Sequence, residues 1–478
     1  MVKINFMEKK IYFIGIGGIG VSALAGYYLS RGFLVSGSDL NQSATTNALK
    51  KKGAIIFIGP HQAGNISKNI DLVIHTAAAT KNNPELKKAK RIGIKTQLYA
   101  EALGDLTKQM FTIAVSGMHG KSTTTAMLAL VLEKAGLDPT VIVGTKLREW
   151  NNMNYRVGKS KYLVIEADEY SASFLNYWPK IIVLTNIEEE HLDFYRDLKQ
   201  IMETFEKYVL HLGKEGILVA NSHDKNTMRI AKRAKCKTKN YSRESEVKNL
   251  NLKVPGKHNI SNAMAVLAVA KQLKIPDKIS IKVLNNFSGT WRRMEFRGKI
   301  NGAKIYDDYG HHPTEIKATL EGAWELLWSR GSSERKFAQG IKRALSRANP
   351  RLFCIFQPHQ YQRTYKLFNQ FLTAFEAADK TIILPIYSVA GREKESIKKK
   401  VSSEKLVKAI KDGLRRAPLS GACSGSKILC PERSRRVLYI DSFQKARNYL
   451  KKNLKESDIC LIMGAGDINK LTDILLKK

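Results

Sequence analysis

The sequence predicts an α/β protein with parallel sheets and three domains. Strand and helix patterns alternate along the chain, apolar runs lead directly into glycine loops, and 478 residues suffice for about three domains of ordinary size. Alternation of this kind favours parallel strands with helices on both faces of the sheet. We expect domains at 1–107, 108–290 and 291–478.

The expected elements follow this alternation in order. Strands are predicted where short apolar runs end at loop-forming residues, at 11–16, 33–36, 72–75, 111–115, 162–166, 181–186, 216–220, 352–357, 381–385 and 459–463. Helices are predicted between them, at 22–30, 123–135 and 198–210. Residues 330–351 and 415–436 interrupt the third domain without strand or helix periodicity, so we expect them to be surface insertions.

Composition excludes several classes of protein. Apolar residues make up 43% of the chain, yet the longest apolar run, 263–270, is too short to cross a bilayer. The N-terminus lacks a signal-peptide cleavage pattern, and five scattered cysteines fit a reducing compartment. We expect a cytoplasmic protein that binds no membrane and is a monomer or a weak homodimer.

The net charge of +37 is high, but basic residues are spread along the whole chain. No nucleic-acid-binding module is recognisable, and aromatic residues are not interleaved with the basic runs. We interpret the charge as a lysine-rich solvated surface, and we expect no nucleic-acid partner.

The first glycine loop follows the first strand and opens a helix. Gly15, Gly17, Gly18 and Gly20 would let backbone N–H groups approach a pyrophosphate, and Asp39 ends the next strand where a ribose-binding carboxylate would lie. By itself this pattern is compatible with NAD, FAD or another nucleotide diphosphate. A glycine turn without a ligand also remains an interpretation.

A second loop lies between an apolar strand and a helix, and its composition suits triphosphate binding. It departs from the usual phosphate-loop pattern because Val115 stands where the first glycine would be. Two glycines free the backbone to wrap phosphates, a lysine can neutralise their charge, and a serine hydroxyl can bind Mg²⁺. The residues are Ser116, Gly117, Met118, His119, Gly120, Lys121, Ser122 and Thr123.

Acidic residues follow the next two strands of this domain. Glu166 begins the run Glu-Ala-Asp-Glu, and His191 lies in the acidic segment 186–193. Carboxylates at strand ends beside a phosphate loop are suitable oxygen ligands for Mg²⁺. Hard Mg²⁺ seldom selects imidazole, so chemistry alone does not predict His191 as a ligand.

Together these motifs and several others resemble the Mur ligases, and among them the branch that joins L-alanine to UDP-N-acetylmuramate. The resemblance covers nearly the whole chain outside the two expected insertions. The segments that carry it are GIGGIGVSALA (15–25), SGMHGKSTTT (116–125), EADEYSASFL (166–175), TNIEEEHLDFY (185–195), GKHNISNAMAV (256–266), GTWRRMEFRG (289–298), DDYGHHPTE (307–315), FQPHQYQRT (356–364) and MGAGDI (463–468).

The resemblance implies a fold and a reaction. The fold is a Rossmann-like UDP-binding domain, a central P-loop ATPase-like domain with a parallel sheet, and a C-terminal Rossmann-like α/β domain that binds the amino acid. The reaction is ATP-dependent and uses Mg²⁺. The carboxylate of UDP-N-acetylmuramate becomes an acyl phosphate, which the amine of L-alanine then attacks.

The resemblance also implies roles for individual residues. The first loop would bind UDP together with Asp39, His75, Thr76 and Ala77, and the second would bind the ATP phosphates, with Lys121 stabilising the transferred group. The other implied contacts are Ser122, Glu166 and His191 to Mg²⁺, His258 and Asn259 to adenine, Arg292 and Asp308 to the nucleotide, and Tyr309, His311, His359 and Arg363 to alanine.

Two of these residues carry more specific expectations. His311 or another nearby base would accept the amine proton. Arg363 would pair with the alanine carboxylate through two hydrogen bonds, and a helix starting just after Pro358 would place it on one face with His359. The alternative for Arg363 is a surface salt bridge. The chain departs from the family pattern at Gln360 and Tyr99, where relatives usually carry arginine.

Three other interpretations remain open. A ligase that attaches a recycled tripeptide to the same UDP-sugar shares the phosphate loop and the histidine-proline segment. A nicotinamide-dependent oxidoreductase would explain Gly15–Gly20 but not the second loop. A nucleic-acid-binding ATPase is suggested by charge alone.

Overall fold

The computed structural model describes residues 9–191, 194–243, 245, 247–328, 350–389, 393, 395–416 and 436–477. These residues form two compact units. Unit 1 runs to Glu189 and includes Leu198–Leu252 and Ser261–Trp291, and unit 2 contains Glu190–Asp197, Lys253–Ile260 and the chain from Arg292 onward. Residues 330–349 and 417–435, the bulk of the two expected insertions, lie outside the described residues.

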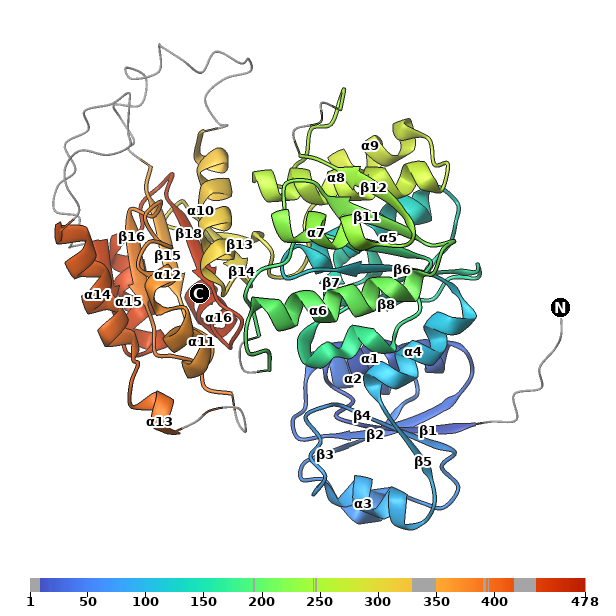
Figure 1. Ribbon diagram of the computed structural model, residues 1–478. Helices are drawn as coiled ribbons and strands as arrows, with labels where there is room; N and C mark the ends of the chain where they lie inside the picture. The colour runs from blue at the N-terminus through green and yellow to red at the C-terminus, as the bar shows by residue number, and fades with distance from the viewer. Residues whose placement is uncertain are drawn as a thin grey trace. The chain divides into compact units, whose positions relative to one another are not determined.

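The first sheet of unit 1 is fully parallel, with the strand order β3-β2-β1-β4-β5 (Figure 1). This order is found in nucleotide-binding α/β domains, where ligands bind beyond the carboxyl ends of the strands. The elements are β1 (Lys10–Ile14), α1 (Ile19–Ser30), β2 (Leu34–Asp39), α2 (Ala44–Lys51), β3 (Ile55–Ile58), β4 (Leu72–His75), α3 (Pro84–Arg91), β5 (Lys95–Leu98) and α4 (Tyr99–Gln109).

The second sheet of unit 1 has seven strands in the order β12-β11-β10-β6-β9-β7-β8. All neighbours are parallel except β7 and β8, so the carboxyl ends of the central strands β10, β6 and β9 meet at one edge. The strands are β6 (Phe111–Ser116), β7 (Thr140–Leu147), β8 (Met153–Arg156), β9 (Tyr162–Glu166), β10 (Ile181–Leu184), β11 (Ile217–Asn221) and β12 (Lys237–Tyr241). The helices are α5 (Lys121–Lys134), α6 (Leu198–Val209), α7 (Lys225–Arg233), α9 (Asp277–Asn286) and α8 (Lys257–Gln272), of which residues 257–260 belong to unit 2.

Unit 2 contains a six-stranded sheet in the order β13-β14-β18-β15-β16-β17, antiparallel only between β13 and β14. Its strands are β13 (Glu295–Ile300), β14 (Ala303–Asp308), β15 (Leu352–Phe356), β16 (Lys380–Ile383), β17 (Val437–Tyr439) and β18 (Ile459–Met463). Its helices are α10 (Pro313–Trp328), α11 (Tyr361–Lys366), α12 (Phe368–Phe371), α13 (Glu395–Lys398), α14 (Ser403–Arg416), α15 (Phe443–Asn453) and α16 (Asn469–Leu476).

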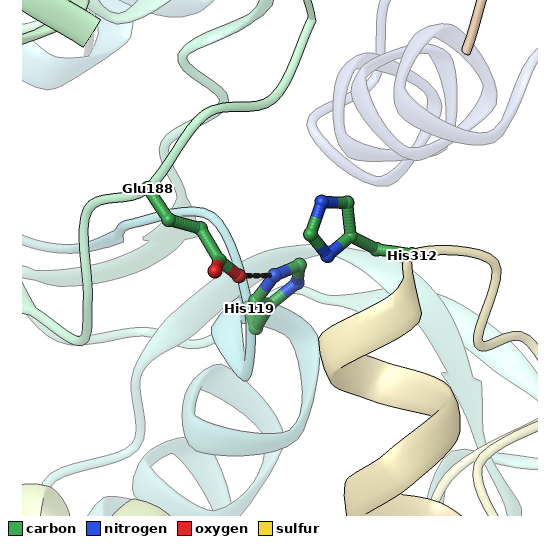
Figure 2. Close-up of side chains that lie close together, drawn as sticks. All are labelled: His119, Glu188 and His312. Carbon is green, nitrogen blue, oxygen red and sulfur yellow. Dashed lines mark hydrogen bonds and ion pairs between the residues drawn. The ribbon is translucent and has the colours of Figure 1, made fainter. Parts of the chain in front are cut away.

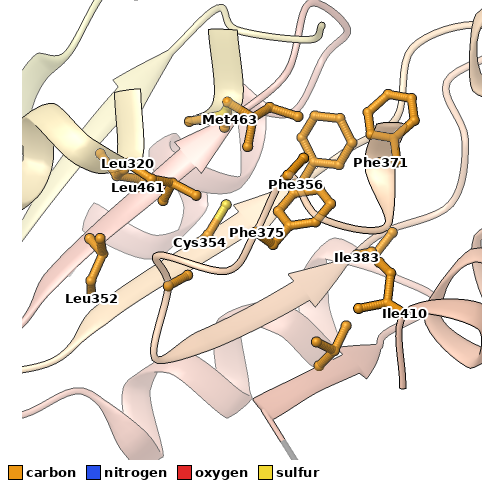
Figure 3. Packing of buried hydrophobic residues seen from close by; sticks show 14 of the residues in the cluster. Leu320, Leu352, Cys354, Phe356, Phe371, Phe375, Ile383, Ile410, Leu461 and Met463 are labelled. Atoms are coloured by element: carbon orange, nitrogen blue, oxygen red, sulfur yellow. The ribbon is translucent and has the colours of Figure 1, made fainter. Parts of the chain in front are cut away.

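A hydrophobic core covers each face of the unit 2 sheet. Side chains alternate along β15, so Cys354 and Phe356 enter the core that also contains Phe371 (Figure 3), whereas Phe353 and Ile355 enter the opposite core. A strand buried on both faces reads as a continuous apolar run, which is why the sequence identified β15.

Two helices begin at residues that periodicity did not predict. Helix α1 starts at Ile19 and α5 starts at Lys121, each directly after a glycine, whereas starts at Ser22 and Thr123 were expected. The first turns of these helices contain glycine or polar residues, so hydrophobic periodicity does not identify where the helices begin. Within the described part of the chain, no helix combines the length and hydropathy needed to cross a membrane.

We expect Phe371→Ala to destabilise unit 2 by about 3–5 kcal/mol, because it removes a fully buried ring from a closely packed core. Phe371 is 1% exposed, whereas Phe296, in the same unit, is 45% exposed and provides the matched control. Chemical denaturation followed by circular dichroism should show a lower midpoint for Phe371→Ala and a nearly unchanged one for Phe296→Ala. Equal shifts in both variants would contradict the assignment of this core.

Candidate functional site

The glycine loop after β1 folds against the end of β4. The N–H groups of Gly15 and Ile16 both donate to the carbonyl of Ser38, at 2.9 and 3.0 Å. Gly15 has φ +77°, and a Cβ built on it would lie 2.6 Å from Cγ2 of Thr76. Only glycine fits at position 15. The close approach of Gly15 to Thr76 brings the glycine loop next to residues 75–77, and both segments were predicted to bind UDP.

Asp39 contacts the loop itself. Its Oδ2 accepts a hydrogen bond from the Gly17 N–H at 2.8 Å, and its Oδ1 accepts one from Asn41 at 3.2 Å. The carboxylate therefore holds the glycine turn in place in this structure. Gly18 and Ala77 are exposed, while His75 is half-buried, and burial lowers the pKa of its imidazole.

Tyr99, one of the two departures from the family pattern, lies against the same loop. A Cβ built on Gly20 would come within 2.8 Å of its ring, so Gly20 is required for α1 to pass this side chain. Burial raises the pKa of Tyr99, and the charges of Glu166 and Asp168 add to this effect. The phenol is therefore neutral at physiological pH.

The phosphate loop after β6 is held by the residues that end β10. Met118 and His119 donate their N–H groups to the carbonyl and the side-chain oxygen of Asn186, at 3.1 and 2.9 Å. The carbonyl of His119 in turn accepts hydrogen bonds from Thr185 Oγ1 at 2.7 Å and from Asn186 Nδ2 at 3.1 Å. These contacts fix the loop path between Gly117 and Gly120.

Gly117 is the position where the loop tolerates no side chain. Its φ is +123°, and a Cβ built on it would lie 2.2 Å from Thr185 Oγ1 and 2.9 Å from the Asn186 nitrogen. The close approach explains why the pattern needs glycine here even though Val115 replaces the first glycine of the usual motif.

Lys121, the first residue of α5, forms a buried ion pair with Glu169. Its Nζ lies 2.9 and 2.8 Å from the two Glu169 oxygens and donates to the Gly117 carbonyl at 2.7 Å. Burial alone would lower the pKa of Lys121, but the carboxylates of Glu169, Asp168 and Glu166 outweigh it, so this pKa is raised. The ammonium is therefore charged and lies beside the loop backbone.

Two of the three expected metal ligands lie together in unit 1. Ser122 Oγ donates to Glu166 Oε1 at 3.0 Å, and the Gly144 N–H donates to Glu166 Oε2 at 2.8 Å. Burial raises the pKa of Glu166, an effect that the Lys121 charge and both hydrogen bonds oppose. His191, the third expected ligand, belongs to unit 2 and has a left-handed backbone, with φ 52°.

His119, at the tip of the phosphate loop, pairs with Glu188. Figure 2 shows the imidazole facing this carboxylate, with Nε2 joined to Oε1. The contact adds a side-chain bond to the backbone bonds that tie the loop to the end of β10. Glu188 was quoted within a motif but was not predicted as a site residue.

In unit 2, the nucleotide-binding residues expected from the family meet at the ends of β14 and β18. Asp308 accepts hydrogen bonds from the N–H groups of Met294 at 2.9 Å and Gly310 at 2.7 Å, and burial raises its pKa. The Arg292 guanidinium donates to the carbonyls of Gly464 and Gly466. Arg292 and Asp308 therefore organise the backbone around this sheet edge.

Tyr309 lies beneath two cations of unit 2. The guanidinium carbons of Arg292 and Arg293 lie 5.2 and 5.3 Å from its ring centre, within the range of cation–π attraction. Arg293 also pairs with Glu315 at 3.3 Å. Neither Arg293 nor Glu315 was predicted as a site residue.

The two residues expected near adenine begin α8. Burial, together with the charge of Arg293, lowers the pKa of His258 to about 4, so the imidazole is neutral at pH 7. The Asn259 side chain donates to the Pro255 carbonyl at 2.7 Å. A neutral ring and a buried amide can both contact an uncharged base.

The alanine-pocket residues expected from the family also gather in unit 2. The rings of His311 and His359 lie 6.1 Å apart, and His359 stacks on Tyr387 at 5.4 Å. Arg363 Nη1 lies 3.1 Å from His359 Nδ1. Helix α11 starts at Tyr361, so the helix start expected just after Pro358 is wrong, and the contact forms although His359 precedes the helix.

Arg363 pairs with Glu190, a residue that was not predicted. Nε and Nη2 of Arg363 donate to Glu190 Oε1 at 3.0 and 2.8 Å, and the side chains are only 9% and 5% exposed. Arg363 therefore forms a salt bridge, as the alternative predicted, but the pair is buried and does not lie at the surface. The guanidinium of Arg363 was expected to bind the carboxylate of a substrate. In this structure its Nε and Nη2 donate to the carboxylate of Glu190 instead.

His311, the expected base, is a neutral and weakly basic imidazole in this structure. Burial, reinforced by the Arg363 charge, lowers the pKa of His311 to about 4, so the ring is neutral at pH 7. Its Nδ1 faces two acceptors, the Tyr309 carbonyl at 3.2 Å and Glu315 at 3.4 Å. The proton therefore resides on Nδ1, which leaves a lone pair on Nε2.

The site residues thus fall into separate groups. The UDP set, the phosphate loop, Ser122 and Glu166 belong to unit 1, whereas His191 and all the residues expected near adenine and alanine belong to unit 2. The residues missed by sequence analysis are mostly carboxylates: Glu169, Glu188, Glu190 and Glu315. Each of these glutamates lies within a motif that was recognised. Their position within those motifs could therefore have identified them as candidate site residues.

The chain matches three family models in order along its length. They are the Mur ligase family catalytic domain at residues 10–110, the Mur ligase middle domain at 115–270 and the Mur ligase glutamate ligase domain at 292–331.

Individual relatives match over nearly the full length. The chain is 40% identical to the UDP-N-acetylmuramate–L-alanine ligase of Clostridium acetobutylicum, covering 99% of both chains, and 38% identical to that of Clostridium novyi, again covering 99% of both. The crystal structure of UDP-N-acetylmuramate–alanine ligase MurC from Thermotoga maritima matches with a TM-score of 0.75, at 26% identity and 98% coverage of both chains. A murein peptide ligase from Psychrobacter arcticus matches with a TM-score of 0.66 at 22% identity, which shows likeness of fold. The chain belongs to the Mur ligase family.

Proposed function

We propose that this protein joins L-alanine to UDP-N-acetylmuramate at the expense of ATP, through an acyl phosphate. The observation that carries the proposal is 40% identity, over 99% of both chains, to a UDP-N-acetylmuramate–L-alanine ligase. The phosphate loop with its charged lysine supports the ATP-dependent half of the reaction.

The first half-reaction activates the carboxylate of the UDP-sugar. A carboxylate oxygen is a poor leaving group, and phosphorylation by ATP converts it into a good one. Lys121 is charged and buried beside the loop, where an ammonium stabilises the charge that spreads over a transferring phosphoryl group. The loop N–H groups and the start of α5 bind the anionic phosphates.

The residues present fit a magnesium ion. Ser122 and Glu166 offer hard oxygen ligands 3.0 Å apart at the start of α5, which suit Mg²⁺. We propose that they hold the ion, with His191 as the third ligand by analogy with the family. When bound, the ion would neutralise charge on the phosphate oxygens.

The second half-reaction joins the amine to the acyl carbon, and phosphate leaves. We propose that the amine proton goes to Nε2 of His311 or to another nearby base. The lowered pKa of His311 makes its imidazole a weak base in this structure. Tyr309, His359 and Arg363 surround this histidine in unit 2 and are proposed to form the alanine pocket.

A tripeptide-adding ligase is the alternative within the family. The structural likeness to the Psychrobacter arcticus enzyme supports the shared fold alone, whereas the full-length relatives at 38–40% identity carry the alanine-ligase name. UDP binding at Gly15–Gly20, a cytoplasmic location and a monomer or weak homodimer remain predictions.

We expect phosphate release from ATP to require UDP-N-acetylmuramate and to be fastest, in kcat/KM, with L-alanine. Glycine and L-serine should be poorer substrates, because glycine lacks the methyl group of alanine, a loss of about 1–3 kcal/mol of binding, and serine adds a hydroxyl group that an apolar pocket does not pair. A colourimetric phosphate assay over single amino acids and the L-alanyl-γ-D-glutamyl-meso-diaminopimelate tripeptide checks this. Preference for the tripeptide would favour the alternative ligase.

We expect Lys121→Ala to lower kcat by at least about 10²- to 10³-fold, because it removes the charge that faces the transferring phosphoryl group. Lys134→Ala, at the exposed end of the same helix, is the matched control and should retain activity. Binding of UDP-N-acetylmuramate, measured by calorimetry, should persist in both variants, since the first glycine loop lies on another sheet. Near-normal turnover of Lys121→Ala would remove it from the site.

We expect Arg363→Ala to raise the KM for L-alanine by about 10- to 100-fold, the value of a charged hydrogen bond. The KM for ATP should change little. Arg363→Lys should recover only part of the loss, because an ammonium cannot reproduce the two hydrogen bonds that Arg363 donates to Glu190. Lys366→Ala, an exposed change in the same helix, is the control. An unchanged alanine KM in Arg363→Ala would exclude Arg363 from the pocket.

A further inference from the structure

Glu190 is a buried carboxylate to which neither the family pattern nor the reaction above assigns a role. Its Oε1 is saturated, because it accepts hydrogen bonds from Arg363 Nε and Nη2 at 3.0 and 2.8 Å and from the His191 N–H at 3.3 Å. The side chain is only 5% exposed. Arg363 thus fixes the direction of this carboxylate.

The second oxygen, Oε2, is buried and accepts no hydrogen bond from any residue that the structure describes. His312 Nε2 lies 3.8 Å from this oxygen, which is within the range of an ion pair but beyond hydrogen-bonding distance. A buried carboxylate oxygen without a donor is unfavourable, so such a group is expected to be matched by an ordered water, an ion or a donor on a ligand.

The chemistry of the substrates indicates which donor fits. ATP and UDP-N-acetylmuramate are anionic and would be repelled by a carboxylate, whereas an amino acid carries an α-ammonium with three N–H donors. A fixed carboxylate oxygen next to the residues proposed for the alanine pocket matches that group in charge and in hydrogen bonding.

We propose that Glu190 binds the α-ammonium of the incoming amino acid through Oε2, while Arg363 holds its Oε1. This inference rests on the proposed function and identifies the group that recognises the amine end of that substrate. It also accounts for the buried Arg363–Glu190 pair, in which the arginine orients a substrate-binding carboxylate. Glu190 would then select amino acids over simple carboxylic acids.

A competing role for Glu190 predicts a change of the KM for L-alanine in the opposite direction. If Glu190 merely occupied the Arg363 edge until a substrate carboxylate displaced it, removal of its charge would lower the KM for L-alanine. Under our proposal the same change raises that KM. The two roles are therefore separated by one kinetic constant.

The test is Glu190→Gln, which keeps the shape of the side chain and removes its charge, with Glu189→Gln as the exposed neighbouring control. We expect the KM for L-alanine to rise by about 10- to 100-fold in Glu190→Gln, with less change in Glu190→Asp and none in Glu189→Gln. Thermal unfolding of each variant reports whether it folds. If Glu190→Gln does not fold, Glu190→Asp should still raise the alanine KM, because its shorter side chain withdraws the carboxylate.

A second readout separates amine binding from carboxylate activation. Hydroxylamine is largely uncharged at neutral pH and traps an acyl phosphate as a hydroxamate without needing an ammonium site. With UDP-N-acetylmuramate and ATP, we expect Glu190→Gln to form hydroxamate at nearly the wild-type rate. A lowered or unchanged alanine KM, or loss of hydroxamate together with alanine ligation, would overturn the proposal. Absence of hydroxamate and of alanine-dependent phosphate release in the wild type would instead refute the proposed function.

Discussion

The contact between the phosphate loop and the end of β10 constrains the other candidate site residues that follow the central strands of unit 1. Thr185 and Asn186 hold the carbonyl of His119, and Gly117 passes so close to Thr185 that a side chain would not fit. Because β10, β6 and β9 are parallel neighbours, their carboxyl ends lie at one edge. Glu166, at the end of β9, therefore meets the start of the helix that follows the loop.

Both units present a cation that is paired with a buried carboxylate. Lys121 pairs with Glu169 at the phosphate loop, and Arg363 pairs with Glu190 in unit 2. An unpaired charge at such depth would be costly, and in each unit the carboxylate compensates the cation and fixes its orientation. Burial by itself would raise the pKa of Glu190, but Arg363 together with His311, His191 and His312 holds it well below its usual value.

Much of the fold was predictable because it depends on local patterns. Apolar runs identified strands such as β6 and β15, and glycine loops located the turns that follow β1 and β6. Helix starts were less predictable, because α1, α5 and α11 each begin with residues that show no apolar period. The division at 107 and 290 remains a prediction, since the described residues separate into two units rather than three.

The sequence by itself determined which loop is the candidate for phosphate binding and which motifs contain the candidate site, since glycine spacing and strand–loop–helix order are local properties. Only the tertiary structure decided how three adjacent glutamates divide their roles: Glu188 faces His119, Glu189 is exposed, and Glu190 pairs with Arg363. The physical reason is that this segment has left strand β10 and turns at His191, whose φ is 52°. No regular period governs side-chain direction there, so each partner is set by groups that are distant in sequence.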